Sequence, residues 1–192
     1  MTASSLFGTA KKYLVTALLP FLALFAMLTA APVLAESVIA TVPAGSTPFA
    51  IAVNLVTNKI YVANVWSNNV TVIDGASNST TTVGVGIVPI KIAVNPVTNK
   101  IYVLNTNSGT VTVIDGATNS TTTVAISWGG DPQAIAVNPA TNKIYIANMQ
   151  SYTVTVLDGA TNNVSAVAVG SSPIYAAVNP VTNKIYVANY NS

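Results

Sequence analysis

The sequence predicts an all-β fold made of repeated units of four short antiparallel strands. Three observations lead to this prediction. Two motifs recur along the chain at one spacing, the segments that carry them are rich in β-branched and aromatic residues, and Gly, Pro, Asn and Asp separate these segments. After residue 35, no stretch shows the 3.6-residue apolar period of a helix.

The first motif is an apolar segment, an Asn-rich turn and a Tyr-containing segment. It occurs four times without gaps, at Ile51–Asn64, Ile92–Asn105, Ile135–Asn148 and Ala176–Asn189. The second motif, Val-Thr-Val-Ile/Leu-Asp-Gly, occurs at Val70–Gly75, Val111–Gly116 and Val154–Gly159. The fourth residue of the first motif is always Asn, and its copies are spaced by 41, 43 and 41 residues. Since two different motifs keep one period, the chain consists of tandem repeats.

Each repeat contains four predicted strands, which the first repeat illustrates. The first strand is the apolar stretch that ends in Ile51–Asn54, and a turn of the type Asn-Pro-Val-Thr-Asn-Lys follows in most repeats, where Pro fixes φ and Asn tolerates left-handed backbone. The second strand is Lys59–Asn64 and the third ends in Val70–Gly75, where Asp should accept backbone hydrogen bonds and Gly should supply a positive φ. The fourth strand is the Thr-rich run Thr80–Val85.

Four antiparallel strands every 40–45 residues or so are typical of a β-propeller blade. The repeats lie near residues 49–85, 90–126, 133–169 and 174–192, the last with two strands, and residues 37–43 resemble the fourth strand of a preceding or closing blade. The predicted fold is therefore an all-β, partial β-propeller of about 3.5–4 blades. Three interpretations stay open: a fragment of a longer gene, which we favour, a strained four-blade ring, and two chains that join into a larger ring.

The repeated motifs resemble one known family. Tyr61-Val62-Ala63-Asn64 and its copies, with the two motifs around them, are similar to the YVTN-type β-propeller repeat over residues 37–192. The tetrapeptide differs at its third position, where Thr is replaced by Ala63, Leu104, Ala147 and Ala188. The resemblance implies an exported or cell-surface protein, with surface-layer components among its relatives, and a binding role without catalytic residues.

Residues 1–35 are interpreted as a secretory signal, which leaves 36–192 as the exported part. Two Lys residues precede 23 uncharged residues, Tyr13 to Ala35, and the small residues Val33 and Ala35 suit a signal peptidase. The alternative is an uncleaved anchor helix, because a run of this length can span a bilayer. Two Pro residues within the run disfavour that helix. We expect no stable membrane insertion after cleavage, and a location at the cell surface, outside the cell or in the periplasm.

Composition argues against several classes of function. Residues 36–192 contain five Lys, five acidic residues and no Arg, so they lack the basic surface that nucleic-acid binding needs. The sequence has no His and no Cys, which excludes disulfides and both Ser-His-Asp and Cys-His catalysis. Asp74, Asp115 and Asp158 occupy one repeat position, and we interpret them as turn residues instead of calcium ligands. We expect no enzyme activity, no cofactor and no metal site.

The connections between strands predict two different faces. Lys59 and Asp74, with their repeat equivalents, should be neighbours on one uniform face. The second-to-third and fourth-to-first connections vary between repeats and should share the opposite face, where recognition is expected. Its candidate partner-binding residues are Trp66, Asn68, Trp128, Asp131, Met149, Gln150, Tyr152 and Tyr190.

These features predict an exported, non-catalytic binding module whose partner is a protein or a glycan. One alternative is a self-associating surface-layer component that joins through an open blade edge at Lys184–Asn189. Another is a fragment of a larger propeller enzyme whose site lies in blades that this sequence lacks.

Overall fold

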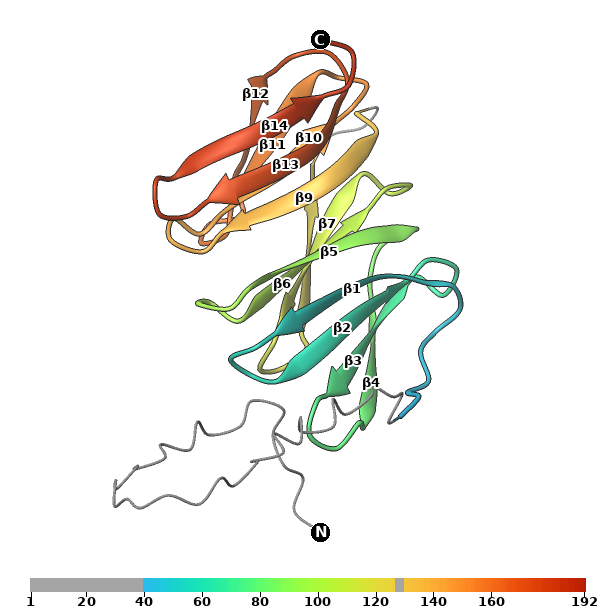
Figure 1. Ribbon diagram of the computed structural model, residues 1–192. Helices are drawn as coiled ribbons and strands as arrows, with labels where there is room; N and C mark the ends of the chain where they lie inside the picture. The colour runs from blue at the N-terminus through green and yellow to red at the C-terminus, as the bar shows by residue number, and fades with distance from the viewer. Residues whose placement is uncertain (1–39, 127–129) are drawn as a thin grey trace, which may run out of the picture. The chain divides into compact units, whose positions relative to one another are not determined.

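The computed structural model describes residues 40–126 and 130–192, so the predicted signal over residues 1–35 lies outside the described part (Figure 1). The first blade consists of β1 (Pro48–Asn54), β2 (Lys59–Asn64), β3 (Asn69–Asp74) and β4 (Thr80–Gly84). The second consists of β5 (Pro89–Asn95), β6 (Lys100–Asn105), β7 (Thr110–Asp115) and β8 (Thr121–Ala125). The third consists of β9 (Pro132–Asn138), β10 (Lys143–Asn148), β11 (Thr153–Asp158) and β12 (Val164–Ala168). A fourth sheet has two strands, β13 (Pro173–Asn179) and β14 (Lys184–Asn189).

The predicted fold class is confirmed. Each blade is a meander in which consecutive strands pair antiparallel, and each strand begins or ends within a few residues of the position expected from the repeat. β-Branched residues suit these half-buried pleated surfaces, and Asn residues with positive φ make the first turn, as at Asn58 with φ of 51°. No helix among the described residues has the length and apolar character needed to cross a membrane.

The strand expected over residues 37–43 is not seen where the structure describes the chain. Residues 37–39 lie outside the described part, and Ala40 to Pro43 form no strand. Pro43 has no backbone N–H to contribute to a ladder. In addition, a fourth strand pairs with a third, and the fourth sheet has only β13 and β14 within the residues that the structure describes.

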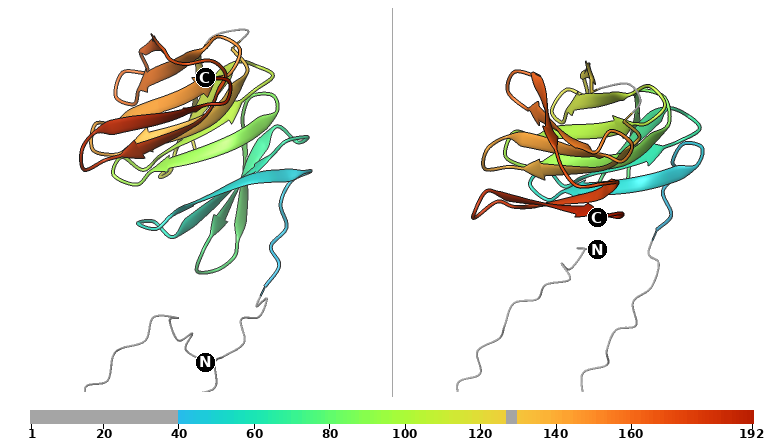
Figure 2. Two further views of the ribbon diagram at one scale, coloured as in Figure 1. Left: turned by 45° about the horizontal axis from the view of Figure 1, so that its top comes forward. Right: turned by 90° about the horizontal axis from the view of Figure 1, so that it is seen from above.

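The blades stack in chain order with their first strands side by side. β1 contacts β5, β5 contacts β9, and β9 contacts β13. Figures 1 and 2 show this row of first strands, with β4, β8 and β12 at the far side of their sheets. These inner strands carry Ala on the face toward the following blade, for instance Ala52 and Ala93, and such small residues allow neighbouring sheets to approach closely.

Side-chain alternation gives each blade two apolar faces that fit together. We call the face with Tyr61 and its repeat equivalents the rear face, and the face with Ile101 and its equivalents the front face. The rear face of the first blade packs on the front face of the second in one buried cluster, which contains Tyr61, Val70, Val72, Val83, Ile101, Val103 and Ile114. The same pairing joins the second and third blades through Tyr102, Leu104, Val111, Val113, Val124, Ile126, Ile144, Ile146 and Leu157.

Asn side chains add a repeated polar contact between successive blades. The Asn that ends each first strand donates through Nδ2 to Oδ1 of the turn Asn in the next blade. These bonds join Asn54 to Asn99 (2.9 Å), Asn95 to Asn142 (2.9 Å) and Asn138 to Asn183 (3.3 Å). Each pair is part-buried, so the bonds fix the relative position of neighbouring blades in addition to the apolar clusters.

The repeated Lys and Asp residues are neighbours on one face, as predicted, since each Lys lies opposite the Asp of its own blade in the ladder. Two details of this face were not predicted. Lys59 lies opposite Asp74 in the ladder, but its Nζ donates instead to the carbonyl of Gly116 in the second blade, at 2.8 Å. A long flexible side chain can reach across a blade boundary, which a repeat pattern within one blade does not reveal.

The Gly of the Asp-Gly turn also has another role than expected. Asp158 Oδ1 accepts the N–H groups of Ala160 and Thr161, at 2.8 and 3.1 Å, as predicted. The positive φ of this turn belongs to Asn162, at 61°, and not to Gly159. Gly159 is required for space, because a Cβ there would lie 2.5 Å from Asn142 Oδ1 and 2.6 Å from the Tyr102 hydroxyl.

Candidate functional site

The variable connections meet at one end of the strands, as the sequence predicted. The second-to-third turn of each blade is hydrogen-bonded to the connection that enters the same blade. The bonds run from Val65 N–H to Thr47 O (2.9 Å), Thr106 N–H to Val88 O (3.0 Å), Met149 N–H to Asp131 O (3.0 Å) and Tyr190 N–H to Ser172 O (2.9 Å). We call this layer of connections the loop surface. The opposite ends of the strands carry the Asn and Asp turns, which we call the turn surface.

Backbone geometry holds the loop surface in one conformation. Thr47, Val88, Asp131 and Ser172, one in each entering connection, have φ values of 55°, 57°, 46° and 53°. Left-handed backbone is costly for β-branched Thr and Val, so surrounding bonds must hold it. One such bond is donated by Val88 N–H to Asn68 Oδ1, at 2.9 Å, and it links the second-to-third turn of the first blade to the connection entering the second.

A constant Ser lies inside each variable turn, a feature that we had not singled out in the sequence. Ser67, Ser108, Ser151 and Ser192 occupy the third turn position. Ser67 Oγ accepts Ser46 N–H at 2.5 Å, and Ser108 Oγ accepts Ile87 N–H at 3.2 Å. In the first two blades the third position therefore holds the two connections together, and in the third blade Ser151 Oγ bonds to Thr153 Oγ1 at the start of β11, at 2.8 Å.

The exposed aromatic candidates occupy other positions of these turns. Trp66, Tyr152 and Tyr190 are all exposed, each at a different position of its turn and each on a different sheet. The turn of the second blade has Thr106 and Asn107 in place of an aromatic residue. The loop surface thus presents a different set of side chains at every blade on one repeated framework.

The remaining candidates divide into structural and solvent-facing residues. Asn68 is exposed, but its Oδ1 accepts the backbone N–H of Val88 and therefore has a structural role. Asp131 is half-buried and accepts a bond from Gln133 Nε2 at 2.7 Å, and Met149 is half-buried beside it. Gln150 is exposed. Trp128 lies outside the described residues.

Charges concentrate on the turn surface. Lys100 pairs with Asp115 at 2.6 Å, and Lys143 pairs with Asp158. The hydrogen bond from Lys143, followed by those from the N–H groups of the turn, lowers the pKa of Asp158 to about 2. Lys100 and the corresponding turn N–H groups lower the pKa of Asp115 to about 2 in the same way. Within residues 40–126 and 130–192, no three His, Cys, Asp or Glu side chains lie together as metal ligands would.

Two buried Tyr hydroxyls lie between blades. Tyr61 and Tyr102 are completely buried, and neither hydroxyl has a hydrogen-bond partner among the described residues. Burial, with a smaller effect of Asp158, raises the pKa of Tyr102 to about 12. The pKa of Tyr61 is raised in the same way, with Asp115 as the nearby charge. Such hydroxyls are poor acids at neutral pH, so these Tyr residues act as core side chains.

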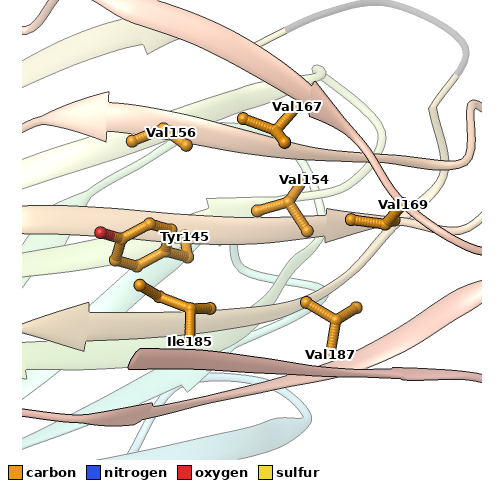
Figure 3. A pocket seen from close by; sticks show the side chains of 7 residues that line it. All are labelled: Tyr145, Val154, Val156, Val167, Val169, Ile185 and Val187. Atoms are coloured by element: carbon orange, nitrogen blue, oxygen red, sulfur yellow. The ribbon is translucent and has the colours of Figure 1, made fainter. Parts of the chain in front are cut away.

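An apolar groove lies between the third blade and β14 (Figure 3). Its volume is about 250 Å³, and it is lined by Tyr145, Val154, Val156, Val167, Val169, Ile185 and Val187. Figure 3 shows Ile185 and Val187 of β14 across from Val154 and Val167 of the third blade. In the two complete blade junctions, the third strand of the following blade adds one residue to the buried apolar cluster, Ile114 in the first junction and Leu157 in the second. The lining offers shape and apolar surface but no catalytic group.

Solved propeller structures share this arrangement. Kuenenia stuttgartiensis hydrazine synthase matches with a TM-score of 0.68 at 20% identity, over 82% of this chain and 47% of that chain. Virginiamycin B lyase from Staphylococcus aureus matches with a TM-score of 0.64 at 11% identity, over 75% and 49%. A chain of a nidogen/laminin complex matches with a TM-score of 0.62 at 12% identity, over 75% and 57%.

These comparisons define the class by fold: the chain is a β-propeller repeat protein, and it spans about half the length of the solved structures that it matches. No family model matches the sequence. No curated protein matches it either.

Proposed function

We propose that this chain is a non-catalytic binding module that recognises a protein or a glycan through the loop surface. The observation that carries the proposal is the contrast within each loop-surface turn. The Ser at the third position is constant, and in the first two blades it is hydrogen-bonded to the entering connection. The flanking positions differ between blades and bear exposed Trp66, Tyr152 and Tyr190. Rigid loops with exposed aromatic anchors are how repeat folds present a recognition surface.

The side chains available in this sequence favour a binding role over catalysis. One of the similar structures is a virginiamycin B lyase that is described as catalytically inactive after a single His-to-Ala substitution. This sequence contains no His. Its repeated Asp side chains are occupied by turn N–H groups, and two of them also by Lys, so none of these is placed as a general acid or base toward a substrate.

The proposed place of action is outside the cytoplasm, at the cell surface or in the periplasm. The support is the amino-terminal pattern of Lys11 and Lys12, the uncharged run and the small residues before Glu36. Fractionation of cells that express the whole chain tests this directly. We expect the protein outside the inner membrane with residues 1–35 removed, as measured by intact mass, and a cytoplasmic chain of full mass would refute it.

The binding proposal is tested with a double variant, Trp66→Ala with Tyr152→Ala. We expect binding to intact cells or envelope fractions to weaken at least tenfold, because both aromatic contacts are lost. The control is Leu55→Ala with Val56→Ala, since these residues are as exposed but lie on the turn surface. Equal binding by the double variant and the control would refute the role of the loop surface. Competition with soluble glycans, compared with protease treatment of the cells, separates a glycan from a protein partner.

A further inference from the structure

Each blade junction joins a rear face to a front face, and one face of each kind is exposed at the ends of the blade array in the residues that the structure describes. In the first junction, Ile92 and Val94 on the front of β5 pack against the rear face of the first blade. In the second junction, Ile135 and Val137 of β9 do the same against the second blade. The interface is thus one repeated design, with aliphatic residues of a first strand against Ala and Tyr of the preceding blade.

The front face of the first blade is open at the corresponding positions. Ile51 and Val53, the equivalents of Ile92 and Val94, are 68% and 47% exposed. Phe49 beside them is exposed as well. Together they form a contiguous apolar strand surface, which is unusual for a surface without a partner.

The rear face of the fourth sheet is open in the same way. Tyr186 is 57% exposed, whereas its equivalents Tyr61 and Tyr102 are completely buried. Tyr175 and Ala177 on β13 are also exposed. One end of the described blade array therefore shows the front half of the interface and the other end shows the rear half.

The interblade Asn contact also lacks a partner at both ends of the described blade array. Three Asn pairs connect successive blades, from Asn54–Asn99 to Asn138–Asn183. By the same step, Asn179 should donate to the turn Asn of a following blade, and Asn58 should accept from a preceding one. Neither side chain makes such a bond within the described residues, although Asn58 already has the left-handed φ of 51° found at Asn99 and Asn142, which are both at 52°.

We propose that two copies of this chain join head to tail and close one propeller ring. The front face of the first blade of each copy covers the rear face of β13 and β14 of the other, and Asn179 of each copy donates to Asn58 of the other. The proposed contact repeats the residue types and positions of the two junctions inside the chain. It is heterologous, so it must either close into a ring or continue as a filament.

The curvature of the chain favours closure after two copies. The chain superposes on two propeller lyases with TM-scores of 0.65 and 0.64 over 75% of its length in both cases, and it occupies 48% and 49% of those chains. The arrangement of its blades therefore matches that of about half of each of these chains, and two copies supply about the length of one. Closure would also cover the exposed first and second strands at both ends of the blade array, as full closure does in other propellers.

The first test is the mass of the purified chain by size-exclusion chromatography with light scattering. We expect a dimer at micromolar concentration. Ile51→Lys and Tyr186→Glu should each weaken dimerisation at least tenfold, because each puts a charge on one half of both junctions. Val97→Lys and Val97→Glu are the matched controls, since Val97 is strongly exposed on a turn of the second blade, away from both end faces, and they should stay dimeric.

A mixing experiment tests the head-to-tail arrangement itself. The Ile51→Lys chain keeps a native rear face, and the Tyr186→Glu chain keeps a native front face. A one-to-one mixture should regain the dimer, because one junction is native and the other brings Lys and Glu together. Asn179→Ala should weaken the dimer several-fold. A wild-type monomer, an open-ended polymer, variants that dimerise normally, or a mixture that stays monomeric would each overturn the proposal; circular dichroism confirms that each variant is folded.

Discussion

Replacing Gly159 with Ala is the sharpest test of how the blades hold together. Gly159 follows the turn residue Asp158 and lies against the Asn142 turn of its own blade and the Tyr102 side chain of the preceding one. An added Cβ would lie 2.5 Å from Asn142 Oδ1 and 2.6 Å from the Tyr102 hydroxyl, both far inside van der Waals contact. Asn142 Oδ1 is also the acceptor for Asn95 at 2.9 Å, so its displacement breaks an interblade bond.

The expected cost follows from these two effects. Overpacking of a tight site costs about 1–3 kcal/mol, and loss of one hydrogen bond costs about 0.5–1.5 kcal/mol. Gly159→Ala should therefore lower the free energy of unfolding by about 1.5–4.5 kcal/mol, which corresponds to about 3–18 °C in Tm for a domain of this size. Backbone strain, the other way in which Ala can destabilise a Gly position, does not apply because Gly159 has no positive φ.

Gly84→Ala is the matched control for this experiment. Gly84 lies in β4, and a Cβ there would meet no atom within 4 Å. Its replacement should leave stability unchanged or raise it by a few tenths of a kcal/mol, because Ala restricts the unfolded chain. Urea unfolding of both variants measures the difference. If Gly159→Ala lies within about 0.5 kcal/mol of the wild type, the close approach between blades does not exist as described.

Two further predictions concern ionisation and the buried hydroxyls. The pKa values of Asp115 and Asp158 are lowered to about 2 in the folded state from 3.8, so the stability that they contribute should be complete above about pH 4 and be lost as the pH falls toward 2. Urea unfolding from pH 2 to 6 should show a smaller loss of stability in Lys100→Met than in the wild type, and an equal loss would contradict the pairing of Lys100 with Asp115. Tyr102→Phe should keep or slightly raise stability, because the hydroxyl that it removes is buried without a partner, whereas Tyr102→Ala should cost about 3–5 kcal/mol, and thermal unfolding of both variants distinguishes this packing role from a polar one.

The strand order was predictable because the same local sequence features recur in every repeat. β-Branched residues, Asn turns and Asp-Gly turns agree in every copy, so one misleading residue could not change the assignment. The position of the loop surface followed from the meander alone, because alternate connections of antiparallel strands must lie at the same end. A sequence with this period therefore predicts the strands of each blade and which connections lie at each end of them.

Contacts between blades could not be predicted in the same way. Lys59 is opposite Asp74 in its own blade, yet it bonds to Gly116 of the next. Both possible partners of Lys59 are present in the sequence, and the choice between them depends on the distance between neighbouring sheets. The same holds for Gly159, whose neighbours Asn142 and Tyr102 come from two different blades. The constant Ser of the loop surface was visible in the sequence, but its meaning needed the bond between Ser67 and Ser46.

The two proposed surfaces use different residues, so experiments can separate them. The loop surface lies at the ends of the strands, whereas self-association uses the faces of the first and last sheets. A ring of two copies is related by rotation about the ring axis, which keeps both loop surfaces on one side of the ring. A surface that carries many copies of the partner would then be bound by both loop surfaces at once, with an apparent affinity well above that of one loop surface.

This coupling predicts how the two sets of variants should differ. Ile51→Lys should weaken binding to cells, where partners are dense, but leave binding to a single soluble partner unchanged. Trp66→Ala with Tyr152→Ala should weaken both kinds of binding and leave the dimer intact. Cell binding and light scattering should be measured on the same four proteins, with wild type and Val97→Lys included. If Ile51→Lys weakens binding to a single soluble partner as much as binding to cells, the open front face contacts the partner directly and the two surfaces are one.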